Sequence, residues 1–378
     1  MNKFRTLLLT TLSSVILMAC SSTKELPELP SFKPTLTVKE IWSANGGDGI
    51  GKEAVLLTPT VTGDLIISAD FKGNVLAHNI NTGKRAWSAS TAKPFTSNLA
   101  ASDELVFIGT KAAEVIALNA QTGKIVWHAE TANQVFAAPA PAGDILLVKS
   151  IDGEIDALNI ETGQLVWNYK NSDPSLVLRG GSAPQIADDK AIIGFGNGKL
   201  LALNLSDGQL LWEQTIAQPQ GTSPLERMVD IDIDPLISNG VIYVATFQGK
   251  VAALSLENGS LLWQHTISAY TGMSLDNDTL YVSDANSDIW AFRLSDGTVI
   301  WKQDALKERQ LTAPVLMNNT LAVADKEGFI HWLSPEDGVF LARTHATSTP
   351  FVASPLVVNN NLYVQSINGD IYAYQIGA

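Results

Sequence analysis

Three aspartates at alternate positions, Asp230, Asp232 and Asp234, bring three carboxylates together in one short segment. If this segment is extended, alternation puts all three on the same side of the chain. Such a group can pair with cationic side chains, or its oxygens can bind a metal ion. Calcium ligands usually come from a tight loop, so the pattern favours the ionic contact.

A second unusual segment carries Leu176, Leu178 and Arg179, where solvent would favour small polar residues. Apolar side chains flanked by charges are typical of protein-binding patches, in which the apolar groups anchor the partner and the charges set its register. Alternatively, the leucines fold back onto the protein and Arg179 neutralises Asp230 or Asp232. The residue types predict a protein-binding patch, with this alternative left open.

Catalytic constellations are missing from the sequence. It contains no nucleophile elbow around a serine, no glycine-rich loop that could cradle a phosphate, and no histidine set close to a candidate nucleophile. The histidines are scattered without metal-ligand spacing: His78, His128, His265, His331 and His345. We therefore predict no catalytic residue, no metal site, no cofactor and no enzyme activity.

The single cysteine, Cys20, follows a short export signal. Residues 1–19 begin with basic side chains and continue into an apolar run that is too short for a membrane-spanning helix. The tetrapeptide Leu-Met-Ala-Cys at positions 17–20 resembles the bacterial lipobox, whose cysteine is acylated and becomes the first mature residue. The alternative is an ordinary signal peptide with an incidental thiol. Serine rather than aspartate after the cysteine resembles outer-membrane lipoproteins, so we expect a lipid anchor on the periplasmic face of the outer membrane.

Residues 20–35 contain several prolines and little that could pack, which predicts that the lipidated cysteine is followed by a flexible tether. The chain has 25 basic and 38 acidic residues, a net charge of −13. Such a charge argues against nucleic acid and against adsorption to anionic lipid. We expect the acyl chains, rather than charge, to hold the protein on the bilayer.

One phrase recurs along the chain and predicts the fold. Ala-Leu-Asn-x-x-Thr-Gly-x-x-x-Trp ends at Trp127 and again at Trp167, and looser copies surround them. Each copy contains four short strand-like runs separated by glycine with aspartate or asparagine. Four antiparallel strands about every 40 residues is the period of a β-propeller. The tryptophan, once per copy on the outermost strand, is expected to fill the wedge between neighbouring blades.

The two ends of the chain complete each other. The seventh copy has Ala342 where a tryptophan is expected, and the eighth stops before its last strand. Residues 36–43 form a strand-like segment that contains an unmatched tryptophan, Trp42. Pairing this segment with the last copy leaves no open edge at the seam. The sequence therefore predicts an all-β, eight-bladed propeller of four-stranded antiparallel blades over residues 36–378, closed by residues 36–43.

The spacing of the repeat glycines locates two enlarged loops. Gly123 and Gly163 stand 40 residues apart, whereas Gly163 to Gly208 is 45 and Gly208 to Gly259 is 51. The extra length follows the outer strands of two successive blades, so both loops join one blade to the next on the same face. They contain the leucine–arginine and aspartate segments, and loops carry most of the function of a repeat scaffold.

These features resemble known families. The Ala-Leu-Asn-x-x-Thr-Gly-Lys-x-x-Trp repeat resembles that of quinoprotein dehydrogenase propellers. With the lipobox at Cys20 and the loop Leu176-Val-Leu178-Arg179-Gly180, the whole chain resembles the BamB family, the propeller lipoproteins of the outer-membrane β-barrel assembly (BAM) machinery of Gram-negative bacteria. The resemblance implies a non-enzymatic scaffold that binds the periplasmic domains of BamA, the central barrel subunit, and helps to present unfolded barrel precursors. It assigns the contact to Leu176, Leu178, Arg179, Asp230 and Asp232.

Two other functions remain as alternatives. A quinone-dependent periplasmic dehydrogenase is disfavoured, because the quinoproteins commonly carry a vicinal cysteine pair at the cofactor and this chain has one cysteine. A general periplasmic propeller for peptides or glycans would instead bind its ligand in the central channel.

Overall fold

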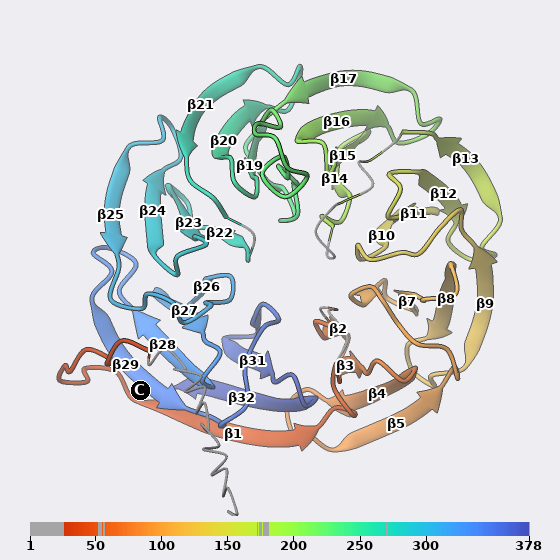
Figure 1. The fold of residues 1–378 in the computed structure, drawn as a ribbon. Coiled ribbons are helices and arrows are strands. Elements are labelled where there is room, and N and C mark those ends of the chain that lie inside the picture. Colours follow the sequence, from red (N-terminus) through yellow and green to blue (C-terminus); the bar gives the residue numbers. More distant parts are fainter. Residues whose placement is uncertain are drawn as a thin grey trace, which may run out of the picture.

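A computed structural model describes residues 26–51, 55, 57–171, 173, 176, 181–269 and 271–377. Within these residues, 32 strands form eight four-stranded antiparallel sheets, arranged as the blades of a ring (Figure 1). The predicted all-β, eight-bladed propeller is confirmed. This part of the chain includes no helix that is long and apolar enough to cross a membrane. The expected signal segment 1–19 and Cys20 lie outside it.

Each blade runs from an inner strand beside the central axis to an outer strand on the circumference (Figure 1). The first four blades are β2 (Thr60–Thr62), β3 (Leu65–Ala69), β4 (Asn74–Asn79) and β5 (Arg85–Ser90); β6 (Ala100–Ala101), β7 (Leu105–Gly109), β8 (Glu114–Asn119) and β9 (Ile125–Glu130); β10 (Ala140–Ala142), β11 (Ile145–Lys149), β12 (Ile155–Asn159) and β13 (Leu165–Tyr169); β14 (Gln185–Ala187), β15 (Lys190–Gly194), β16 (Lys199–Asn204) and β17 (Leu210–Thr215). The last four are β18 (Leu236–Ser238), β19 (Val241–Ala245), β20 (Lys250–Ser255) and β21 (Leu261–Thr266); β22 (Met273–Leu275), β23 (Thr279–Ser283), β24 (Ile289–Arg293) and β25 (Val299–Gln303); β26 (Val315–Met317), β27 (Thr320–Ala324), β28 (Phe329–Leu333) and β29 (Phe340–His345); β30 (Leu356–Val358), β31 (Asn361–Gln365), β32 (Asp370–Ile376) and β1 (Val38–Asn45).

The Asn-x-x-Thr-Gly phrase forms the turn between the third and the outer strand of a blade. In blade 2, Asn119 Oδ1 accepts hydrogen bonds from Thr122 N at 3.0 Å and from Thr122 Oγ1 at 2.8 Å. Gly123 then adopts a φ of +68°, a left-handed conformation that glycine reaches without steric cost. The chain thereby reverses from β8 into β9.

The tryptophan of each outer strand joins its blade to the next. Trp87 Nε1 donates to Ala120 O of blade 2 at 2.9 Å, and its ring lies against Gly123. A Cβ atom on Gly123 would lie 2.5 Å from that ring. The same contact recurs in the pairs Trp42–Gly83, Trp127–Gly163, Trp167–Gly208, Trp212–Gly259, Trp263–Gly297 and Trp301–Gly338. The recurring glycine and tryptophan are therefore the two halves of one contact between blades.

Strand β1 closes the ring. It pairs antiparallel with β32, from Val38 opposite Ile376 to Asn45 opposite Asp370, so both ends of the chain build blade 8. The predicted closure is confirmed, although the strand begins and ends two residues later than the predicted segment 36–43. Trp42 Nε1 donates to Ile80 O of blade 1 at 2.9 Å, as the other tryptophans do to their neighbours.

The missing tryptophan at Ala342 has a structural reason. The other tryptophans pack on the turn that leads into the outer strand of the next blade, and in blade 8 the chain is open there: Gly377 N donates to Thr37 O at 2.8 Å. Ala342 pairs with Trp332 of β28, whose ring is fully buried and packs with Tyr374 in the core between blades 7 and 8. An aromatic ring from a different strand fills this wedge.

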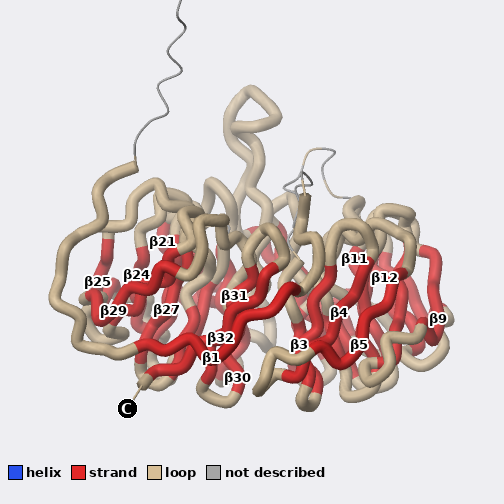
Figure 2. The backbone as a smooth tube through the Cα atoms, turned by 90° about the horizontal axis from the view of Figure 1, so that it is seen from below, coloured by secondary structure: helices blue, strands red, loops and turns tan. Residues whose placement is uncertain are grey.

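The two faces of the ring differ in the connections that they carry. We call the loop face the side that holds the connections between blades and the turns between second and third strands. We call the turn face the opposite side, which holds the remaining turns. Figure 2 shows the ring from its edge, with the strands running between the two faces.

Candidate partner-binding site

The two enlarged loops emerge next to each other on the loop face. The first follows β13 and the second follows β17. In Figure 1 the green connection between β17 and β18 extends over the inner part of the ring. Leu176 of the first loop exposes 46% of its surface, whereas Leu178 and Arg179 lie outside the described residues.

Two carboxylates of the second loop bind the backbone of the first. Asp232 Oδ1 accepts a hydrogen bond from Gly181 N, and Asp234 Oδ1 accepts one from Ala183 N at 2.6 Å. Hydrogen bonds to an ionised acceptor are stronger than neutral ones. The two loops predicted from the glycine spacing are therefore linked at Gly181 and Ala183.

Asp230 lies deeper than the other two aspartates. It is 3% exposed, and Ile231 and Ile233, which alternate with the aspartates, are buried in the cores on the two sides of blade 5. The segment belongs to no sheet; it is held by Ile231 N, which donates to Phe195 O at 3.2 Å. The two isoleucines thereby fix the position of the carboxylates above blade 4.

A buried lysine lies beneath both loops. Lys149, the last residue of β11, is 5% exposed. Its Nζ donates to Gly194 O at 2.5 Å and lies 5.2 Å from the centre of the Phe195 ring. The ammonium group of blade 3 thus reaches across to blade 4, beneath the point where the second loop crosses it.

The lysine and the aspartates form one electrostatic group. Burial lowers the pKa of Lys149, and the carboxylates of Asp173, Asp232, Asp230 and Asp234 act in the opposite direction. Burial likewise raises the pKa of Asp173 and of Asp232, and it raises that of Asp234 to about 6. Asp234 still exposes part of its surface to water, whereas Asp232 is more enclosed.

A small cavity separates Lys149 from the loops. Its lining includes Lys149, Asp173, Gly181, Asp230 and Asp232, and its volume is about 30 Å³. Cofactor pockets are roughly ten times larger, so this cavity is too small for a quinone. The arrangement is suited to holding two loops in place.

Lys149 is the residue of this group that the sequence reasoning missed. The equivalent position, at the end of the second strand, is small in six other blades: Ala69, Gly109, Gly194, Ala245, Ser283 and Ala324. Aligning the repeats strand by strand shows Lys149 as the charged exception, beside Gln365 in blade 8, whereas the spacing of glycine and tryptophan does not. Among the residues that the structure covers, no group of three histidine, cysteine, aspartate or glutamate side chains could hold a metal ion.

The repeated turn, the glycine–tryptophan contact and the closing strand define an eight-bladed propeller of the PQQ-like repeat class, in which two linked loops depart from the repeat. The family model for the outer membrane protein assembly factor BamB matches residues 71–303 and 298–377. The chain belongs to the BamB family.

Individual relatives agree with this assignment. The outer membrane protein assembly factor BamB of Pseudomonas aeruginosa is 44% identical over 307 residues, which cover 80% of this chain and 81% of that protein. The crystal structure of BamB from Moraxella catarrhalis superposes with a TM-score of 0.82 at 26% identity, covering 90% of this chain and 100% of the other. A quinohemoprotein alcohol dehydrogenase from Comamonas testosteroni gives a TM-score of 0.71 at 15% identity, over 90% of this chain and 76% of that one, and this likeness shows the fold alone.

Proposed function

We propose that this chain is a non-enzymatic, lipid-anchored scaffold of the outer-membrane β-barrel assembly machinery, lipidated at Cys20 and held on the periplasmic face of the outer membrane. It binds the periplasmic domains of BamA and assists the insertion of barrel proteins. Membership of a family whose proteins are named outer membrane protein assembly factors supports this role. The residues proposed for the BamA contact are Leu176, Leu178, Arg179, Asp230 and Asp232.

The linkage between the two loops is the observation that carries the proposed site. Asp232 and Asp234 hold the backbone of the first loop at Gly181 and Ala183 before any partner arrives. A preformed surface loses less conformational entropy on binding, which favours affinity. Leu176 then offers an exposed apolar anchor five positions before Gly181.

This geometry divides the proposed residues into two roles. Leu176 is exposed and can touch a partner directly. Asp232 is engaged with Gly181, and Asp230 is buried beside Lys149, so both act mainly by positioning the loops. Arg179 is proposed as the charged contact beside the leucines.

Capture of the purified periplasmic domains of BamA tests the site. We expect Leu176→Ser and Asp232→Ala each to weaken binding about tenfold, which corresponds to about 1.4 kcal/mol, with little change in melting temperature. Arg179→Glu should weaken it as well. The matched control is Asp296→Ala, which removes an exposed ion pair with Arg293 on the turn face. Folded Leu176→Ser and Asp232→Ala variants that bind as the unchanged protein does would refute this site.

The scaffold proposal also has an enzymatic test. The cavity beneath the loops, with a volume of about 30 Å³, is too small to hold a quinone at that place. Dye reduction by the protein after incubation with quinone and calcium would contradict it.

A further inference from the structure

The N-terminal segment before β1 packs along the outside of blade 7. Leu29 and Phe32 lie against the core between blades 6 and 7, which includes Leu306 and Leu333. The ring of Phe32 stacks on that of Phe340 in β29, with centroids 5.5 Å apart and an interplanar angle of 24°. The proline-rich part of the chain thus has a docking surface on the propeller.

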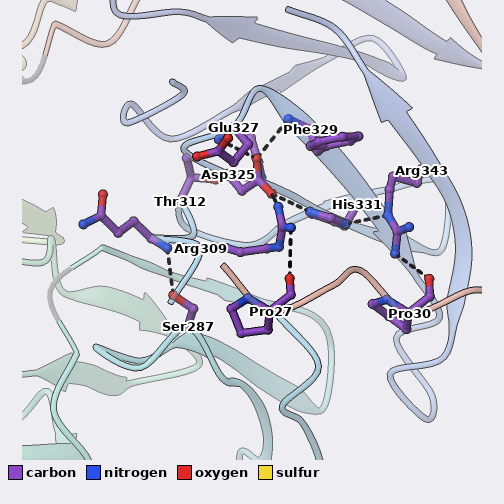
Figure 3. Close-up of polar contacts among 12 residues, drawn as sticks. Pro27, Pro30, Ser287, Arg309, Thr312, Asp325, Glu327, Phe329, His331 and Arg343 are labelled. Atoms are coloured by element: carbon purple, nitrogen blue, oxygen red, sulfur yellow. Dashed lines mark hydrogen bonds and ion pairs between the residues drawn. The ribbon is translucent and has the colours of Figure 1, made fainter. Parts of the chain in front are cut away.

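Two arginines of the propeller bind backbone carbonyls of this segment (Figure 3). Arg309 Nη2 donates to Pro27 O at 3.4 Å, and Arg343 Nη2 donates to Pro30 O at 3.1 Å. The Arg343 guanidinium also lies 5.0 Å from the centre of the Phe32 ring, a cation–π contact. Polar and aromatic contacts therefore hold the same few residues.

Two buried residues, Asp325 and His331, hydrogen-bond to the two arginines. Asp325 Oδ2 accepts hydrogen bonds from Arg309 Nη1 at 3.0 Å and from His331 Nε2 at 2.9 Å. His331 Nδ1 accepts one from Arg343 Nε at 3.3 Å. Because Nδ1 accepts from an arginine, the proton of a neutral His331 lies on Nε2. Asp325 and His331 are fully buried, and their hydrogen bonds restrict the orientations of the Arg309 and Arg343 side chains.

The corresponding aspartates of two other blades have different partners. Asp70, Asp284 and Asp325 each use Oδ1 to accept backbone hydrogen bonds in the turn after the second strand. Asp70 Oδ2 accepts from Asn74 Nδ2 of its own blade and from Asp48 N, which follows β1. Asp284 Oδ2 accepts from Trp290 Nε1 of its own blade. In blade 7, Oδ2 of Asp325 instead accepts hydrogen bonds from Arg309 and His331, which connect it to the N-terminal segment. The turn alone does not require this network.

The segment runs from one face of the ring to the other. Arg309 lies in the connection between β25 and β26, so Pro27 is held at the loop face. Thr35 N donates to Leu341 O at 2.9 Å, and Thr37 O accepts from Gly377 N beside the start of β1, at the turn face. Figure 2 shows the chain descending along the outside of the ring to β1. The chain therefore enters the described structure at the loop face.

We propose that residues 26–36 are a fixed strap, which turns the loop face of the propeller toward the lipid surface that holds the N-terminus. The inference rests on the proposed lipid anchor at Cys20. Leu26 lies six positions after Cys20, and an extended chain spans at most about 3.6 Å per residue, so the strap begins within about 20 Å of the acylated cysteine. A chain with net charge −13 is not drawn to anionic lipid, so the strap rather than charge sets the orientation.

The first test asks whether the strap is docked in solution. Spin labels at Glu28→Cys in the strap and Glu161→Cys in the opposite blade, in the mature chain with Cys20→Ser, report one distance by pulsed electron paramagnetic resonance. Both positions are exposed. We expect a narrow distance distribution that becomes broad in Phe32→Ser and in Arg343→Ala. The control Arg293→Ala, which breaks an exposed ion pair of blade 6, should leave it narrow. A broad distribution in the parent protein would overturn the strap.

The second test asks which face meets the lipid. The lipidated protein, without BamA, is placed on phosphatidylcholine vesicles that contain a lipid-borne energy acceptor. A dye at exposed Gln220→Cys on the loop face should transfer more energy than one at Glu161→Cys on the turn face, and Phe32→Ser should abolish the difference. Equal transfer in the parent protein would overturn the orientation. Failure to bind vesicles would instead refute the anchor at Cys20, while the solution test still decides the strap.

Discussion

A Cβ atom on Gly83 would lie 2.7 Å from the ring of Trp42, so blade 1 accepts the closing strand because that turn residue has no side chain. Trp42 comes from the N-terminal strand of blade 8, and its contact with Gly83 is one of those that join blade 8 to blade 1. The same geometry repeats between successive blades, which makes glycine and tryptophan interdependent positions.

Gly123→Ala should therefore destabilise the protein more than an equivalent change at an open turn. Gly143 is the matched control, because its φ of +59° is also left-handed but nothing lies within 4 Å of its Cβ position. Both changes cost about 1 kcal/mol of backbone strain. Gly123→Ala adds overlap with Trp87, about 1–3 kcal/mol. Denaturant unfolding measures the difference, and equal destabilisation would contradict the contact model.

Trp42→Ala should weaken the closure of the ring. Removing a buried aromatic ring typically costs about 3–5 kcal/mol, here at the seam where both chain ends meet. Ile41→Ala on the same strand is the control, since Ile41 is 39% exposed. We expect a clear drop in melting temperature for Trp42→Ala alone. Similar melting temperatures for the two variants would show that the ring does not depend on this contact.

Lys149→Met should destabilise the loop region in a pH-dependent way. The lysine offsets the charge of Asp173, Asp230, Asp232 and Asp234, so its replacement removes a buried positive charge from among these carboxylates, an effect of about 3 kcal/mol. The loss should be larger at pH 7.5 than at pH 5, because the raised pKa values let these carboxyls take up protons in acid. Lys170→Met, at a side chain 81% exposed, is the control. A pH-independent loss would argue against the electrostatic role.

His331 should make stability fall in mild acid. Burial lowers its pKa in the folded protein despite the Asp325 carboxylate, while Arg309 and Arg343 oppose protonation further. The unfolded chain therefore binds a proton below about pH 6.5 that the folded chain does not, and stability is lost as the pH falls through that value.

His331→Gln isolates this effect. Asp234, whose pKa is raised to about 6, changes stability with pH in the opposite direction. Because parent and variant both contain Asp234, its effect cancels in the difference between them. The difference in unfolding free energy between parent and variant should shift by about 1 kcal/mol from pH 7.5 to pH 5.5. A constant difference would mean that His331 protonates equally well in both states.

The repeat made most of the fold predictable. A glycine and a tryptophan recur because each turn meets its neighbour in the same way, so counting them gives the blades, and the unmatched Trp42 gives the closure. The two enlarged loops could be predicted because they lengthen the otherwise regular spacing between the repeat glycines. The sequence did not reveal that Asp232 and Asp234 bind backbone amides of the first loop, because those partners depend on where the loops cross.

The features that the sequence did not predict depend on contacts between residues far apart in the chain. Lys149 donates a hydrogen bond to Gly194 of the next blade, and no local sequence pattern indicates this contact. The prolines of residues 20–35 predict a flexible tether with little that could pack, whereas Leu29 and Phe32 of this segment pack on the propeller. Its docking depends on Arg343, whose position is set by His331 on the neighbouring strand.

The open turn of blade 8 has a consequence for the order of the chain. Gly377 N and Thr37 O are hydrogen-bonded, so the first and last strands of the ring meet where every other blade has a continuous turn. A circularly permuted chain, with these strands linked and a new break at another such turn, would keep the four strands of every blade and disrupt only the glycine–tryptophan contact at the new break. The propeller thus has no obligatory first blade, and its natural starting point decides only which wedge lacks a tryptophan and where the strap attaches.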